Sequence, residues 1–77
     1  MNPVMTVNEV VAFYTSARQN SSVADAATQT ITQLAITPSL LADAFSAAQL
    51  DSSRSDTEAK VIHAHRNELL SYLKTQD

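Results

Sequence analysis

Apolar side chains recur along this chain at steps of three and four residues, the spacing that places them on one face of an α-helix. Four such rows follow one another, separated by short polar segments. In chain order the rows are Val7, Val10, Val11, Tyr14 and Ala17; Val23, Ala27, Ile31 and Leu34; Leu41, Ala44, Phe45 and Ala48; and Ile62, Leu69, Leu70 and Leu73. The pattern predicts a single all-α domain over residues 1–77, folded as a compact bundle of four to five short helices.

The polar segments between the rows contain helix-start signals. Three are capping boxes, in which a Ser or Thr side chain and an acidic side chain three residues later each bind a free backbone N–H. They are Thr6–Glu9, Ser22–Asp25 and Ser55–Glu58. Thr37-Pro38 is a fourth start, because the residue before proline avoids the α region and proline is favoured at the first helical position. The first helix is therefore expected to begin at Thr6, and the last to run to about Lys74.

Three segments are less sharply defined by the pattern. The first helix should end near residues 19–22, where Asn20 is the candidate for a left-handed backbone. Residues 30–36 are rich in Thr and would also suit a strand, but an isolated strand would find no partner in this chain. Residues 51–55 form a polar linker, which would hold one more helical turn if the bundle has five helices.

The chain contains no glycine and no cysteine. Phosphate-cradling loops, dinucleotide loops, the nucleophile elbow and the calcium-binding helix–loop–helix all need glycine at fixed positions, so these sites are excluded. Tight hairpin turns also favour glycine, which argues against a strand-rich fold. Without cysteine there is neither a disulfide nor a thiolate site.

Charged residues are sparse, and the formal net charge is −3. The five Lys and Arg residues are scattered rather than arranged in a basic stripe, so a nucleic-acid partner is not expected. The N-terminus lacks the positive region of a signal peptide, and the longest apolar run, Val10–Tyr14, is far too short to span a bilayer. We expect a protein that is made in the cytoplasm and does not span a membrane.

Few residues offer chemistry. The chain has two histidines, His63 and His65, but two helical positions place them roughly 200° apart around the axis, so they cannot bind one metal ion together. Glu68 follows His65 by three residues, which predicts an ordinary surface pair worth about 0.2–0.5 kcal/mol. The tyrosines, Tyr14 and Tyr72, could bring their hydroxyls to the surface. We expect no catalytic residue, no metal site and no cofactor, and hence a non-enzymatic protein.

Residues 23–50 contain only two charged side chains, Asp25 and Asp43, and no Lys or Arg. The simpler interpretation is a compact bundle in which the Ser, Thr and Gln residues of this stretch face water. The functional interpretation is a helical hairpin that turns its apolar face toward lipid or a partner helix, although interfacial helices usually carry Lys or Arg on the polar face. The residues that would face lipid or a partner are Val23, Ala27, Ile31, Leu34, Leu41 and Phe45.

Over essentially its full length the chain resembles the PAS factor, a small family of vibrio-type proteins. The resemblance rests on the size, the composition without glycine or cysteine, the opening Asn2-Pro3-Val4 with Thr6–Glu9, and the Thr37-Pro38 restart. It implies a saposin-like fold, a folded leaf of short helices with an apolar concave side, here without the disulfides of true saposins. It also implies interaction with phospholipid membranes and promotion of the release of periplasmic proteins.

Two functions are therefore expected as alternatives. In the first, the protein binds a phospholipid membrane surface peripherally, at the inner membrane or in the periplasm, and assists secretion. In the second, it is a protein-interaction module that docks a partner helix on the same low-charge apolar face. The sequence does not predict the oligomeric state.

Overall fold

The computed structural model describes the backbone of residues 3–76 and the side chains of residues 7–76. Over that range the chain forms four helices: α1 (Pro3–Arg18), α2 (Val23–Leu34), α3 (Pro38–Gln49) and α4 (Asp56–Thr75). The Cα radius of gyration is 11.5 Å, close to the value of about 11–12 Å expected for a compact chain of this length. The predicted all-α bundle is confirmed, and the Thr-rich segment belongs to α2 rather than to a strand.

Three of the predicted helix starts are confirmed by hydrogen bonds from the cap side chains. The cap hydroxyl accepts from a backbone N–H three residues later: Ser22 from Asp25 at 3.2 Å, Thr37 from Leu40 at 3.0 Å, and Ser55 from Glu58 at 3.2 Å. Each bond satisfies one of the free N–H groups of the first turn.

The predicted start of the first helix is wrong. α1 begins at Pro3, so Thr6 lies inside the helix and is not its N-cap. Proline suits the first turn of a helix, because its missing N–H would have no helical partner there and its φ is already close to the helical value. The proline signal therefore prevails over the capping box that follows it.

The left-handed residue is Ala35 and not Asn20, which is the second correction. Among residues 3–76, Ala35 is the one non-glycine residue with a positive φ, 53°. It ends α2, and the N–H groups of Ala35 and Ile36 both reach back to the carbonyl of Ile31. α1 ends instead in a tight turn, in which Gln19 N–H bonds the Ser16 carbonyl, so Asn20 is not needed to reverse the chain.

Residues 51–55 hold no helical turn, so the bundle has four helices over the described residues rather than five. Asp51 Oδ1 accepts hydrogen bonds from the Ser53 N–H at 3.0 Å and the Ser53 hydroxyl at 2.6 Å. An Asp side chain that takes a nearby backbone N–H competes with helix formation, which explains why this linker turns instead of coiling. The same two bonds from Ser53 hold the pKa of Asp51 below its usual range.

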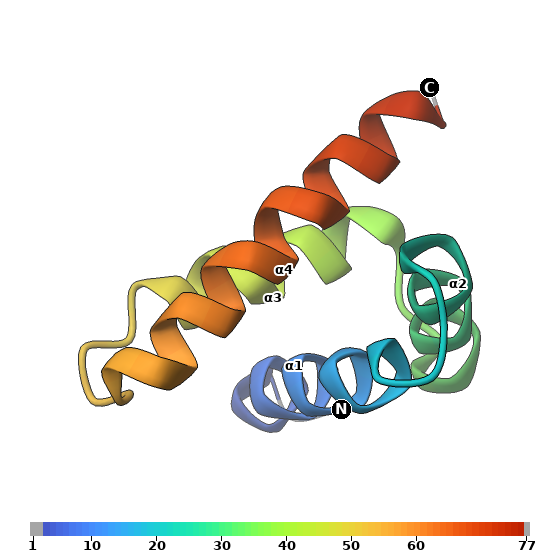
Figure 1. The fold of residues 1–77 in the computed structure, drawn as a ribbon. Coiled ribbons are helices and arrows are strands. Elements are labelled where there is room, and N and C mark those ends of the chain that lie inside the picture. The colour runs from blue at the N-terminus through green and yellow to red at the C-terminus, as the bar shows by residue number, and fades with distance from the viewer. Residues whose placement is uncertain (1–2, 77) are drawn as a thin grey trace.

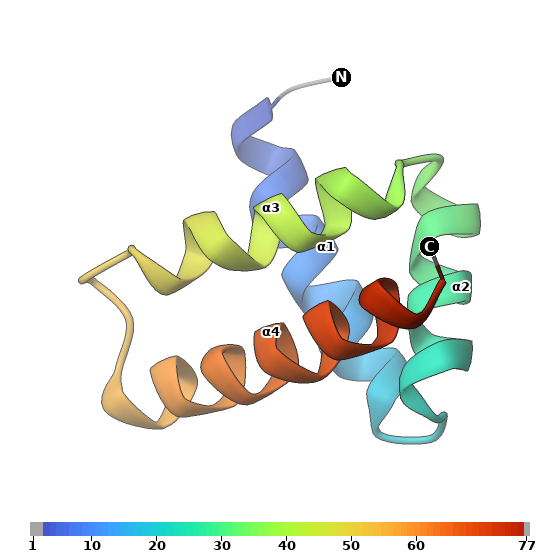
Figure 2. The same cartoon turned by 90° about the horizontal axis from the view of Figure 1, so that it is seen from above.

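The helices form two hairpins that lie across each other. Figures 1 and 2 show α3 and α4 side by side and antiparallel, with α1 crossing beneath them and α2 standing at one end. α1 packs mainly on α2 and α3, and its backbone approaches α4 at few points. Along the chain, residues 35–37 are the covalent connection between the α1–α2 hairpin and the α3–α4 hairpin.

The core lies between the two hairpins and is small. The largest side chains that are fully buried are Tyr14, Phe45, Leu41, Leu69, Val10 and Thr30. The Tyr14 and Phe45 rings meet edge to face with centroids 5.3 Å apart, which joins α1 to α3. The Thr30 hydroxyl donates to the Ala26 carbonyl at 2.8 Å, so this buried polar group is satisfied within α2.

Candidate functional site

Of the six residues predicted to face lipid or a partner, all but Val23 belong to the core or pack against it. Ala27, Leu41 and Phe45 are each fully buried. The other three, Val23, Ile31 and Leu34, are half-buried. The apolar face of residues 23–50, the central hairpin of α2 and α3, is covered by α1 and α4 in this structure. It would reach a lipid or a partner helix only if the bundle opened.

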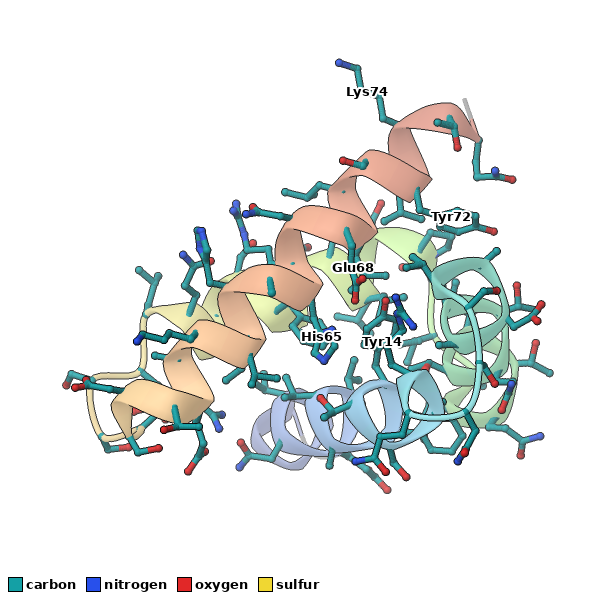
Figure 3. All side chains as sticks on the ribbon, in the orientation of Figure 1. Tyr14, His65, Glu68, Tyr72 and Lys74 are labelled. Atoms are coloured by element: carbon teal, nitrogen blue, oxygen red, sulfur yellow. The ribbon has the colours of Figure 1, made fainter. Side chains whose placement is uncertain are left out.

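A polar cluster around Glu68 joins α1 to α4. Glu68 Oε1 accepts from the Tyr14 hydroxyl at 3.2 Å and contacts His65 Nδ1 at 2.5 Å. Glu68 Oε2 accepts from both Nε and Nη2 of Arg18 at 3.3 Å. Figure 3 shows Tyr14, His65 and Glu68 together in the space between the two helices. Because a carboxylate only accepts hydrogen bonds, His65 Nδ1 carries a proton in this arrangement.

This cluster is not predicted by the sequence, and two expectations about its residues are wrong. Glu68 and His65 are more than a surface pair, because the Glu68 side chain is only 25% exposed and four donors surround it. The Tyr14 hydroxyl does not reach the surface, since the whole residue is buried. The available signal was the spacing of Tyr14 with Arg18 and of His65 with Glu68, one helical turn each.

The cluster shifts the pKa values of two of its members. Partial burial alone would raise the pKa of Glu68, but the hydrogen bonds from His65 and Arg18, together with their charges, outweigh it and hold the pKa below its usual range. Burial, reinforced by the negative charge of Glu68, raises the pKa of the Tyr14 hydroxyl. The Tyr14 phenol is thus held in its neutral form, in which its hydroxyl donates the bond to Glu68 that links the two hairpins.

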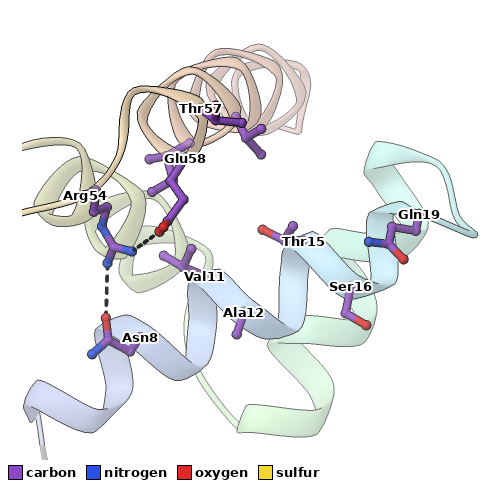
Figure 4. Close-up of a pocket in the computed structure, with 11 residues that line it drawn as sticks. Asn8, Val11, Ala12, Thr15, Ser16, Gln19, Arg54, Thr57 and Glu58 are labelled. Carbon is purple, nitrogen blue, oxygen red and sulfur yellow. Dashed lines mark hydrogen bonds and ion pairs between the residues drawn. The ribbon is translucent and has the colours of Figure 1, made fainter.

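A groove of about 600 Å³ runs between α1 and α4. Its apolar floor is formed by Val11 and Ala12 of α1 and by Val61 and Ile62 of α4, and polar side chains form its edges. Arg54 closes one end, where its Nη2 donates to Asn8 Oδ1 at 3.1 Å and its Nη1 lies 3.6 Å from Glu58 Oε2 (Figure 4). The groove has the size of a ligand pocket and the apolar lining typical of one.

A second groove, of about 640 Å³, lies on the face that α3 and α4 share. One wall is formed by α3 and includes Ala42 and Asp43, and the other is the last part of α4, with Leu70 and Lys74. Asp43 and Lys74 are both exposed. The groove therefore carries opposite charges on opposite walls.

The two histidines lie in different surroundings, His63 at the surface and His65 at the edge of the core. His63 is exposed and contacts the amide side chains of Gln49 and Asn67, whereas His65 packs edge to face on Tyr14 with ring centroids 5.3 Å apart. Within the described part of the chain, no group of three or more His, Cys, Asp and Glu side chains is placed to hold a metal ion.

None of the helices described by the structure combines the length and the apolar character needed to cross a bilayer. Comparison of the chain with protein-family models, curated proteins and solved structures gives no match. The all-α fold thus rests on the structure, and the resemblance to the PAS factor stays a prediction from the sequence.

Proposed function

We propose that this chain is a non-enzymatic protein that binds phospholipid membranes peripherally and promotes the release of periplasmic proteins. In this proposal the bundle is the closed form of a saposin-like leaf, and the two hairpins part at residues 35–37 when the protein meets lipid. The observation that carries it is the division of the apolar core between two hairpins that a single three-residue segment connects.

The energetics favour opening on lipid but not in water. Burying a large apolar side chain gains about 1.5–3 kcal/mol, whereas a chain of this length is stable by only about 4–12 kcal/mol in total. Exposing Tyr14, Leu41, Phe45 and Leu69 to water would therefore consume most or all of the stability. Acyl chains can cover the same side chains, so the cost of opening largely disappears at a membrane.

Two further features are consistent with opening. The chain has no cysteine, so no disulfide ties one hairpin to the other. Among residues 7–76, the polar bonds between the hairpins come from a few side chains, chiefly those of the Glu68 cluster and the bond from Arg54 to Asn8. These bonds would be exchanged for water or lipid head groups as the hairpins part.

A cross-link across the hairpins tests the proposal. In the wild type, the side chains of Asn8 and Arg54 hydrogen-bond to each other across the hairpins. Because the chain has no cysteine of its own, the variant Asn8→Cys/Arg54→Cys carries two cysteines at these positions and no others. A short bifunctional maleimide would hold the hairpins closed, and the same variant capped with a monofunctional maleimide is the matched control. We expect the capped protein to cosediment with phospholipid vesicles and release a trapped dye, and the cross-linked protein to lose dye release.

The outcomes separate the parts of the proposal. Equal dye release from the cross-linked and the capped protein would refute opening, and absence of vesicle binding by the wild type would refute the membrane function itself. In Gram-negative cells, expression should raise the extracellular activity of a periplasmic reporter enzyme without raising that of a cytoplasmic one.

The alternative function is docking of a partner helix, and the groove between α1 and α4 is the observation in its favour. This groove, rather than the covered central hairpin, offers an apolar floor with polar edges in the closed form. Helix-in-groove recognition uses such surfaces. If the wild type ignores vesicles but binds an amphipathic helical peptide, and Val61→Asp at the groove abolishes that binding, the alternative replaces the membrane function.

A further inference from the structure

The groove shared by α3 and the end of α4 is an apolar surface left open in the closed bundle. Ala42 lies on its α3 wall, Leu70 and Leu73 on its α4 wall, and Ile31 of α2 also lines it. Leu70 is 39% exposed, which makes it one of the few large apolar side chains at the surface. Figure 2 looks onto the face where α3 and α4 lie side by side, and Figure 3 shows Lys74 projecting from the end of α4.

The two charged side chains that line this groove are Asp43 and Lys74. Asp43 on the α3 wall and Lys74 on the α4 wall form no ion pair with each other or with any other residue among residues 7–76. Both side chains are exposed, and they line the groove together with its apolar residues. A complementary partner surface would place a basic side chain opposite Asp43 and an acidic side chain opposite Lys74.

The surface with that reverse order is the same groove on a second copy of the chain. A two-fold axis that lies in the interface and runs parallel to the groove sets the α3 wall of one molecule against the α4 wall of the other, and in such an interface each residue pair occurs twice. We propose that the chain forms a two-fold symmetric homodimer through this groove, in which Asp43 of each molecule pairs with Lys74 of the other and the apolar floors face each other.

The dimer is expected to be weak. A stable specific interface buries about 800 Å² on each partner, which is about a sixth of the 4867 Å² of surface that this small chain exposes. The groove and its edges form only part of one face. Association should therefore build up over protein concentrations from about 10 μM to about 1 mM, and it should weaken as salt screens the two charge pairs.

Charge reversal tests the pairing directly. Sedimentation of the wild type at low salt should show a mass that rises from one chain toward two with concentration. Asp43→Lys makes the groove doubly basic and Lys74→Asp makes it doubly acidic, so each change alone should weaken self-association at least about tenfold. An equimolar mixture of these two variants should associate within about threefold of the wild type, because the basic groove of one now faces the acidic groove of the other.

The double variant Asp43→Lys/Lys74→Asp should also recover self-association, since both pairs are restored in reverse. Glu9→Lys and Lys60→Asp are matched controls, because they change the net charge by the same amounts at exposed positions outside the groove. Circular dichroism of every variant verifies folding. A wild type that stays monomeric up to about 1 mM, a mixture that fails to recover association, or controls as damaging as the groove variants would each overturn the dimer. None of these results bears on vesicle binding.

Discussion

The Tyr14 hydroxyl donates a hydrogen bond to the carboxylate of Glu68, 54 positions later in the chain, at 3.2 Å. This bond and those from Arg18 tie the first helix to the last, although the two backbones approach at few points. The carboxylate is thus the centre of the polar contact between the hairpins, and three of the predictions below depend on it.

Glu68→Gln should destabilise the bundle by about 1–3 kcal/mol at neutral pH, because hydrogen bonds to a charged group are replaced by weaker neutral ones. Urea unfolding followed by circular dichroism measures the loss. Glu58→Gln is the control, since the Glu58 side chain is 60% exposed in its ion pair with Arg54 and such pairs contribute about 0–1 kcal/mol. Equal losses for the two variants would contradict the central role of Glu68.

Glu68 should also make stability depend on acid pH. Its pKa in the folded protein lies below the usual value of about 4.3. The unfolded chain then binds the proton more readily, so the stabilisation is fully present above the unfolded pKa and is lost as pH falls through the folded one. The difference in unfolding free energy between the wild type and Glu68→Gln should therefore shrink below about pH 4. A constant difference down to pH 2 would contradict this assignment.

The two histidines should behave differently when replaced. His65→Ala removes a bond to Glu68 and the ring contact with Tyr14, so we expect a loss of about 1–3 kcal/mol. His63 is exposed, and His63→Ala should change stability by less than about 0.5 kcal/mol.

Calorimetric titration of the wild type with zinc should show no tight stoichiometric site, and a submicromolar one-to-one site would contradict the expectation of no metal centre.

The start of α3 should depend on Thr37 rather than on Pro38. Thr37→Ala removes the cap bond to the Leu40 N–H and should cost about 0.5–2 kcal/mol. Pro38→Ala should cost little, because the proline supplies no N–H at the first helical position. Thermal unfolding of the two variants compares them, and a larger loss from Pro38→Ala would show that the joint is stabilised in another way.

Ala35→Gly should stabilise the closed bundle by about 1 kcal/mol, because glycine adopts a positive φ without the steric cost that a Cβ adds. Ala64→Gly is the opposite control, since Ala64 is exposed in the middle of α4 and glycine in a helix interior loses about 1 kcal/mol. Urea unfolding should therefore move the two variants in opposite directions.

The helices were predictable because their starts are local. The caps at Ser22, Thr37 and Ser55 each depend on a backbone N–H only three residues away, so the sequence window contains the whole signal. The start of α1 was misread because two local signals, Pro3 and the Thr6–Glu9 box, compete within one turn. The left-handed residue was misassigned because Asn20 has the higher intrinsic preference, whereas helix packing decides which turn must reverse the chain.

The candidate sites were harder to predict. The Glu68 cluster depends on how α1 crosses α4, which the sequence does not encode in any short window. For Leu41 and Phe45 the apolar spacing is the same whether the face packs on α1 or on lipid, so periodicity alone could not tell a core from a binding surface. The groove between Asp43 and Lys74 is likewise set by the packing of α4 on α3.

Ala35, in the segment that connects the two hairpins, has a strained backbone conformation. A left-handed backbone costs a residue with a Cβ about 1–2 kcal/mol, and Ala35 carries this strain at the point where the two hairpins meet. The strain is tolerated while the packed bundle fixes the turn. In the proposed opening, straightening of residues 35–37 would release that energy, so Ala35 would add a small bias toward opening at the joint itself.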